Sequence, residues 1–272
     1  MVRGLLLNGM VCVLAGLQGG LPADAQAPPA ALAPQAAPKP VPAPVSPTVP
    51  QRRFVVVLDA AHGGEDGGAQ LAGSVAEKTV TLALSVRLRS LLTARGFSVV
   101  TTREGNVRVE PDVRAQIANR AGGSSGGGAA ACLSLHATQT GSGVHIFVSS
   151  LAPAAPTRFL AWKTAQSVYV TRSLKLAGVV NGAFERGSDG GPIAASLART
   201  NLPGMDSMTC PAVAIEMAPV RGSDGAIVTE VTDEQYQTQV VQALADALLV
   251  WRTDWESDAL RPDLKAAGSK LP

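Results

Sequence analysis

The stretch that decides the fold is residues 54–69, which read FVVVLDAAHGGEDGGA. Its first five residues are apolar and mostly β-branched. Such a short continuous run is typical of a strand buried on both faces in a parallel sheet. A glycine-rich loop follows from Ala60 to Gly73 and contains His62. Apolar residues then recur at helical spacing and predict a helix after the loop: Val80, Leu84, Leu88, Leu91 and Leu92.

The same alternation of strand and helix continues along the chain. Further strands are predicted where short apolar runs recur: residues 97–101, 131–135, 144–148, 193–197 and 212–215. Helices are predicted after Pro111, within residues 157–186 and near the C-terminus. This order predicts an α/β fold, a single domain with a mostly parallel central sheet flanked by helices.

The boundaries of this domain follow from its first strand and its last helix. Thr232 and Gln235 match a capping box, and a stripe of apolar residues follows them as far as Trp251. We therefore place the domain at residues 53–252 and expect a polar tail over residues 253–272.

The N-terminal segment has the three-part pattern of a secretory signal peptide, predicted over residues 1–27. Arg3 gives a positive start, an apolar stretch follows, and Ala23-Asp24-Ala25 supplies small residues of the A-x-A type. An uncleaved anchor is the alternative, but the apolar stretch is short and contains polar residues. Residues 28–52 form a linker rich in Pro and Ala, a composition that favours extended polyproline-II structure. We predict an exported, periplasmic protein with no membrane anchor after signal cleavage.

The charge composition argues against nucleic acid as a partner. Charged residues make up 16% of the chain and the net charge is +2, so no basic field indicates binding to nucleic acid.

Removal of the signal peptide leaves two cysteines, Cys132 and Cys210. An oxidising compartment would allow them to pair. Both lie in apolar runs, and buried free cysteines are common, so we favour two free thiols over a disulfide.

Three residues that can bind metal or transfer protons follow strands directly. His62, His136 and Glu216 come at or just after the ends of three predicted strands, and Glu77 lies at the head of the first helix. Sites in open α/β sheets form at the carboxyl ends of the strands. Two histidines and a carboxylate are a common ligand set for catalytic zinc. The set therefore predicts a metal site assembled from distant parts of the chain.

Each of these residues also has a structural explanation. Glu77 is electrostatically favourable at a helix N-terminus whatever else it does. His62 lies beside two glycines, where a role in the loop is as reasonable as a role as ligand. The third histidine, His145, lies within a predicted strand, and we expect it to pack or to form hydrogen bonds.

Taken in order, the motifs resemble those of the zinc-dependent N-acetylmuramoyl-L-alanine amidases of the type-3 amidase family. That family shows D-P-G-H-G-G-x-D-x-G-A after a strand, then E-K, T-R, R-x-x-x-A-N, S-I-H-A-N and P-A-V-L-V-E. No single motif is specific, but the set is specific in this order. The matching residues span about 54–216: Asp59–Ala69, Glu77-Lys78, Thr102-Arg103, Arg114 with Ala118-Asn119, Ser134–Ala137 and Pro211–Glu216.

The resemblance implies a function and a role for each site residue. His62, Glu77 and His136 match the zinc ligands, and Glu216 matches the catalytic glutamate. The implied substrate is peptidoglycan, cut between N-acetylmuramic acid and L-alanine for cell-wall remodelling or cell separation. The resemblance leaves room for an activator protein as a second partner. Zn²⁺ lowers the pKa of a bound water toward about 7, and the glutamate would pass its proton to the leaving amine.

The chain departs from the family pattern at three places. Ala60-Ala61 replaces Pro-Gly, Thr138 replaces the Asn after His-Ala, and Met217-Ala218-Pro219 replaces T-G-F. The departures at Thr138 and at residues 217–219 leave open a wall-binding domain without catalysis. Because the fold and the metal do not set the substrate, a zinc peptidase or amidase acting on another exported amide is also open.

Overall fold

A computed structural model describes residues 54–122, 129–156, 160–187 and 191–259. The predicted signal peptide over residues 1–27 and the linker over residues 28–52 lie outside the described residues.

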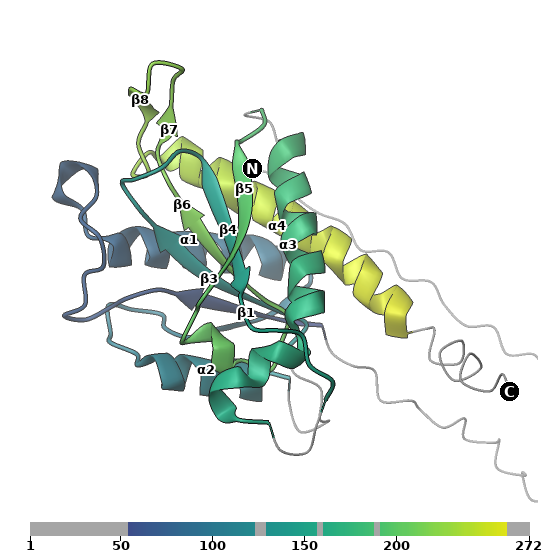
Figure 1. The fold of residues 1–272 in the computed structure, drawn as a ribbon. Coiled ribbons are helices and arrows are strands. Elements are labelled where there is room, and N and C mark those ends of the chain that lie inside the picture. Colours follow the sequence, from purple (N-terminus) through teal and green to yellow (C-terminus); the bar gives the residue numbers. More distant parts are fainter. Residues whose placement is uncertain (1–53, 123–128, 157–159, 188–190, 260–272) are drawn as a thin grey trace, which may run out of the picture. The chain divides into compact units, whose positions relative to one another are not determined.

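The centre of the domain is a six-stranded sheet in the order β2-β1-β3-β6-β4-β5 (Figure 1). Every neighbouring pair is parallel except β4 with β6, so the prediction of a mostly parallel sheet is confirmed. The strands are β1 Val55–Ala60, β2 Ser98–Thr101, β3 Ala131–Ala137, β4 Val144–Ser149, β5 Ala195–Thr200 and β6 Ala212–Met217. A short hairpin, β7 Val220–Arg221 with β8 Ile227–Thr229, projects beyond the sheet.

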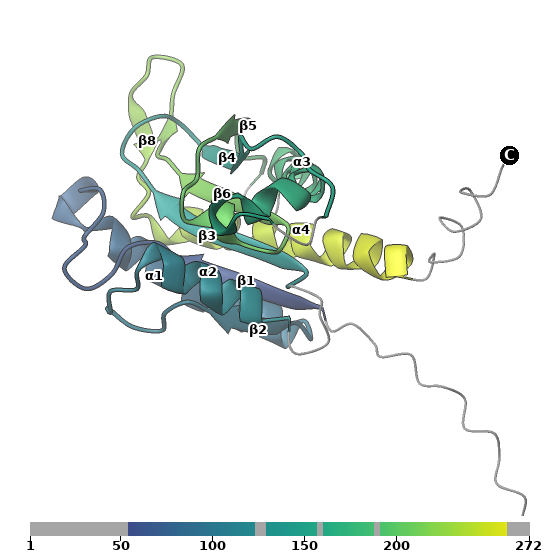
Figure 2. The same ribbon diagram turned by 60° about the horizontal axis from the view of Figure 1, so that its bottom comes forward.

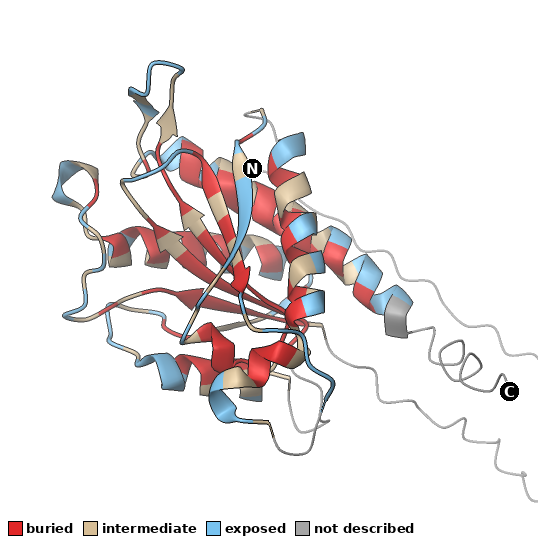
Figure 3. Cartoon of the chain, viewed as in Figure 1, coloured by how far each residue is buried: buried red, intermediate tan, exposed pale blue. Residues whose placement is uncertain are grey.

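The helices cover the two faces of the sheet unequally. They are α1 Glu77–Ala94, α2 Pro111–Arg120, α3 Val170–Arg186 and α4 Glu234–Ala259. Successive side chains of a strand point to opposite faces. On one face the strands share a large core with α1, α3 and α4, and on the other a smaller core with α2 and the 3-10 helix Met205–Ser207. Because fewer helical residues pack on the second face, part of that face is exposed to solvent, above all along β5 (Figure 3).

The last helix differs from its prediction at both ends. It begins at Glu234, and its capping side chain is Asp233, whose Oδ1 accepts the backbone N–H of Tyr236 at 2.8 Å. The predicted capping box at Thr232 is therefore wrong by one residue. At the other end the helix continues to Ala259, and it extends past the strands in Figures 1 and 2. Trp255 is buried there in edge contact with Phe54.

None of the helices described is both long enough and apolar enough to cross a membrane.

Cys132 and Cys210 form a disulfide, so the expectation of two free thiols is wrong. Cys132 lies in β3, and Cys210 lies just before β6, the strand that pairs with β3. The parallel pairing thus brings together two side chains that are 78 residues apart in the sequence. The bond ties the segment before β6 to the sheet, next to the 3-10 helix Met205–Ser207.

We expect the double variant Cys132→Ala/Cys210→Ala to unfold more easily than the oxidised protein. A cross-link across a loop of this length restricts the unfolded chain and typically contributes about 2–4 kcal/mol. Urea denaturation followed by circular dichroism should show the lower free energy of unfolding. A reductant should shift the midpoint of the wild type but not that of the double variant. An unchanged wild-type midpoint under reduction would contradict the prediction.

Candidate active site

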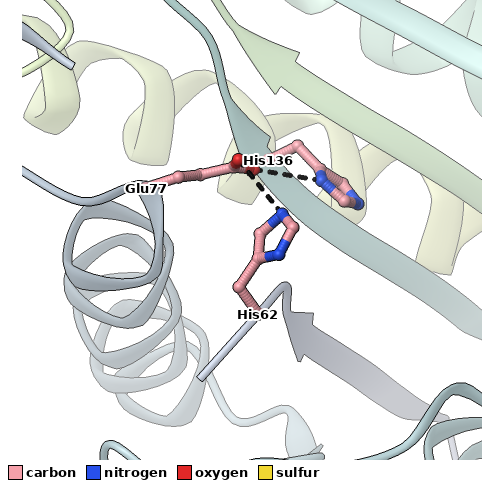
Figure 4. A group of neighbouring side chains, drawn as sticks. All are labelled: His62, Glu77 and His136. Atoms are coloured by element: carbon pink, nitrogen blue, oxygen red, sulfur yellow. Dashed lines mark hydrogen bonds and ion pairs between the residues drawn. The ribbon is translucent and has the colours of Figure 1, made fainter. Parts of the chain in front are cut away.

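The sheet brings three of the predicted residues into one cluster at the carboxyl ends of its strands (Figure 4). His62 follows β1, His136 lies near the end of β3, and Glu77 is the first residue of α1. The ligand atoms of the three side chains lie within 4.8 Å of one another. His62 Nε2 is 3.1 Å from Glu77 Oε2, and His136 Nδ1 is 3.1 Å from Glu77 Oε1.

Neighbouring side chains set the tautomer of each histidine. The Asp66 carboxylate lies 2.9 Å from His62 Nδ1, and the hydrogen bond from His62 is the main cause that lowers the pKa of Asp66. Ser134 donates its hydroxyl to Asp59 Oδ2 at 2.8 Å, so its oxygen can accept the Nε2–H of His136 at 3.3 Å. In both rings the nitrogen facing Glu77 is then the one that carries the free electron pair.

Glu77 is held as a carboxylate in a buried position. Only 5% of the residue is exposed. Burial is the largest influence on its pKa and raises it, but the contact with the His136 ring and the hydrogen bonds from the N–H groups of Ala69 and Ala137 outweigh burial. The net result is a lowered pKa, so both oxygens are available as acceptors or ligands.

The loop before Glu77 fits closely around the cluster. A Cβ at Gly68, whose φ is +66°, would lie 2.6 Å from Glu77 Oε2 and 2.6 Å from a ring carbon of His62. His62 itself has a φ of +62°, which is unusual for a residue other than glycine. Strained backbone of this kind persists where the surroundings impose it, often at functional sites.

Two buried arginines impose that conformation. Arg114 donates to the carbonyl oxygens of Ala60 and His62 and pairs with Asp59 at 2.6 Å. Arg103 donates to carbonyl oxygens that include those of Ala60 and Ala61. Together the guanidinium groups hold the chain on both sides of the His62 side chain.

Glu216, the residue matched to the catalytic glutamate, lies beside the cluster but does not join it. It is in register with His136 on the neighbouring strand, so both side chains lie on the same face. Among the described residues, no hydrogen bond or ion pair reaches its half-buried carboxylate. The Glu216 side chain is therefore free to act on a bound molecule.

A cavity of about 400 Å³ opens next to the cluster. His62 and His136 form part of its wall, and the side chains of Leu202, Met205 and Met208 make another part apolar. Glu216 does not line the cavity. The cluster thus borders a cavity whose wall is partly apolar, and Glu216 lies outside that wall on the strand next to His136.

The cluster fits a metal ion of the zinc type. With the tautomers set by Asp66 and Ser134, two nitrogen electron pairs and a carboxylate converge, and only a cation or protons can bridge them. The nitrogen–oxygen distances of 3.1 Å are close to the roughly 3.3 Å between ligands of a tetrahedral zinc ion. Two nitrogens and one oxygen are a donor set found in catalytic zinc sites, with a fourth position left for water.

The residues that orient the ligands were only partly predicted. Asp59 is the acceptor that fixes Ser134 and Arg114. Asp66 and Ser134 lie in the matched motifs but were given no role. A carboxylate four residues after His62 and a serine two residues before His136 were the available signals.

We expect Ser134→Ala to weaken zinc binding by about 10- to 100-fold, because the residue that orients a ligand ring is lost. Competition for zinc with a chromophoric chelator would measure this. Ser85→Ala, which removes a buried serine two turns along α1, is the matched control and should bind zinc as the wild type does. Equal affinities in the two variants would show that Ser134 does not position His136.

The fold and the cluster define an α/β protein with three convergent side chains able to bind a metal and a free carboxylate beside them. Residues 56–250 match the family described as N-acetylmuramoyl-L-alanine amidase, and the chain belongs to that family. The expectation drawn from the motifs is confirmed.

Two curated relatives match over short segments. The germination-specific N-acetylmuramoyl-L-alanine amidase of Bacillus subtilis (strain 168) is 38% identical over 65 residues, which is 24% of this chain and 27% of that protein. The N-acetylmuramoyl-L-alanine amidase AmiC of Neisseria meningitidis serogroup B is 41% identical over 63 residues, 23% of this chain and 15% of that protein. The chain thus matches less than a third of the length of either relative.

Solved structures share the fold over most of the domain. The catalytic domain of the amidase CwlV from Bacillus (Paenibacillus) polymyxa var. colistinus superposes with a TM-score of 0.55 at 24% identity, covering 73% of this chain and 98% of that one. The CwlD amidase of Clostridioides difficile, solved in complex with the GerS lipoprotein, gives 0.53 at 18% identity, covering 74% and 99%. At these identities the likeness establishes the fold.

Proposed function

We propose that the protein hydrolyses the amide bond between N-acetylmuramic acid and L-alanine in peptidoglycan, with zinc as its cofactor. The observation that carries the proposal is the convergence of His62, Glu77 and His136 beside the free carboxylate of Glu216. Membership of the amidase family supports the choice of substrate.

In the proposed reaction, His62, Glu77 and His136 hold the metal. A bound zinc ion supplies Lewis-acid polarisation of the lactyl carbonyl and lowers the pKa of a water toward about 7. The chain itself keeps the histidine rings in the required tautomers through Asp66 and Ser134. The burial of Glu77 and the close fit of Gly68 leave little room for the ligands to rearrange.

Glu216 moves the proton. Its carboxylate has no partner in the described part of the chain, so it can accept a proton from the attacking water. It then gives that proton to the nitrogen of the leaving L-alanine, which departs as a neutral amine while the lactyl group becomes a carboxylic acid. The new acid afterwards loses its own proton to the solvent. The same group serves as base and then as acid, and no other proton carrier is required.

The location and the partners follow from the same proposal. A cell-wall substrate fits the export expected from the signal peptide over residues 1–27, and the periplasm is the proposed compartment. Cell-wall remodelling or cell separation is the proposed process. The complex of CwlD with GerS supports the proposal of an activator protein for this chain as well.

Digestion of purified peptidoglycan tests the proposal against its alternatives. We expect mass spectrometry to find stem peptides with a free L-alanine amino terminus, and we expect a chelator to abolish their release. A zinc peptidase would release fragments cut between amino acids, and a wall-binding domain would bind peptidoglycan and release nothing. Either result would overturn the proposed function.

A further inference from the structure

The sheet face that carries His136 continues as a row of polar side chains away from the metal cluster. His136, Glu216, His145 and Ser196 are register neighbours on β3, β6, β4 and β5 in turn. Neighbours in register project from the same face at about 4.8 Å intervals, the spacing of adjacent strands. This polar row runs from the cluster to the exposed edge strand of the sheet (Figure 3).

His145 is held in a defined orientation within the polar row. Its Nδ1 lies 2.8 Å from the hydroxyl of Ser196. Its Nε2 faces Gly141 so closely that a Cβ at that position would lie 2.5 Å away. Arg221 holds this loop by donating to the carbonyl oxygens of Gly141 and Gln139. The metal cluster and Glu216 already account for the proposed chemistry, so His145 is an ordered polar side chain that the reaction does not use.

The direction of proton transfer decides which part of the substrate reaches this row. Glu216 must lie next to the departing nitrogen in order to protonate it. The peptide is attached to that nitrogen, so it leaves from the Glu216 side of the cluster. The acyl side, which carries the muramic acid, then lies toward the cavity lined by Leu202, Met205 and Met208.

We propose that His145 and Ser196 form the subsite for the departing peptide, with His145 as a residue that selects for peptide length. The proposal rests on the proposed function. One strand spacing separates Glu216 from His145, and a second separates His145 from Ser196. An extended peptide advances about 3.3–3.6 Å per residue. His145 therefore meets the first or second residue after the cut, and Ser196 meets about the third.

The chemistry of the pair fits a peptide. One donor of the pair is used in the hydrogen bond between them, so the other, the Ser196 hydroxyl or the Nε2–H of His145, remains for a carbonyl or carboxylate oxygen of the peptide. Because Ser196 and Ala198 on β5 are exposed, the floor of the subsite is open and a chain can extend across it. The cavity at the cluster has polar as well as apolar lining residues and remains available to the sugar and its lactyl group.

The test uses the full zinc-loaded protein and its two reaction products as inhibitors. We expect His145→Ala to raise the inhibition constant of the free stem tripeptide about tenfold, which is the effect of one lost hydrogen bond to a charged or polar group. The inhibition constant of N-acetylmuramic acid should not change. The preference in kcat/KM for a muramoyl tripeptide over muramoyl-L-alanine should fall by a similar factor.

Leu197→Ala is the matched control, because Leu197 is exposed on β5 and points to the opposite face from Ser196. It should leave both inhibition constants unchanged. Ser196→Ala, at an exposed position, should weaken inhibition by the tripeptide about threefold. This variant still tests the peptide subsite if His145→Ala does not fold.

Two results would overturn the subsite while the proposed function stands. In the first, the wild type cleaves both substrates but neither His145→Ala nor Ser196→Ala changes inhibition by the tripeptide. In the second, the variants weaken inhibition by N-acetylmuramic acid instead, which would place the peptide in the cavity. A wild type that cleaves neither substrate would overturn the proposed function and the subsite together.

Discussion

Glu216→Gln should leave a folded, zinc-loaded protein whose rate of amide hydrolysis is lower by a factor on the order of 10² to 10⁴. Gln has nearly the same shape as Glu but cannot accept a proton from water and return it to the leaving amine. The ligands His62, Glu77 and His136 are unaffected by the change. Release of stem peptides per zinc-loaded protein is the quantity to measure.

The zinc content of the Glu216→Gln protein separates the possible roles of this residue. Full zinc content with lost activity is the expected result, because Glu216 does not contact the cluster in the described structure. Loss of zinc would make Glu216 a ligand. Activity close to that of the wild type would remove it from the reaction.

His62→Ala and His136→Ala should each lose the zinc ion and, with it, activity. Each variant leaves only two of the three ligands, too few to hold zinc firmly. Elemental analysis of the dialysed proteins measures zinc per chain, expected to be about one for the wild type. The matched control is His145→Ala, which removes the only other histidine of the chain.

His145→Ala should keep its zinc, because the residue lies two strands beyond His136 in the polar row. Full zinc content in both His62→Ala and His136→Ala would show that the metal binds elsewhere. Loss of zinc from all three histidine variants would indicate unfolding, which circular dichroism would reveal.

Much of the fold was predictable because the strands are short apolar runs and the helices carry regular apolar stripes. The run from Phe54 to Leu58 gave β1, and each apolar run that followed proved to contain a strand. The antiparallel pairing of β4 with β6 was not predicted, since strand order depends on contacts between distant segments. The capping residue Asp233 of α4 was missed because Thr232 also fits a capping pattern.

The candidate site was predictable where a motif names its residues and not where the fold brings them together. His62, Glu77 and His136 stand in matched motifs, and the sheet unites them. The disulfide between Cys132 and Cys210 could not be predicted in this way, because it depends on the parallel register of β3 with β6. The roles of Asp66 and Ser134 likewise depend on which nitrogen of each histidine faces Glu77.

Oxygen labelling identifies the bond that is cut from the position of the new oxygen. Hydrolysis of a muramoyl peptide in H₂¹⁸O places that oxygen on the carboxyl group that the cut creates. If the cut bond joins the lactyl group of muramic acid to L-alanine, we expect label in the lactyl carboxylate of N-acetylmuramic acid and none in the released peptide, with no turnover after removal of the metal. Label in a carboxyl group of an amino acid would contradict this expectation.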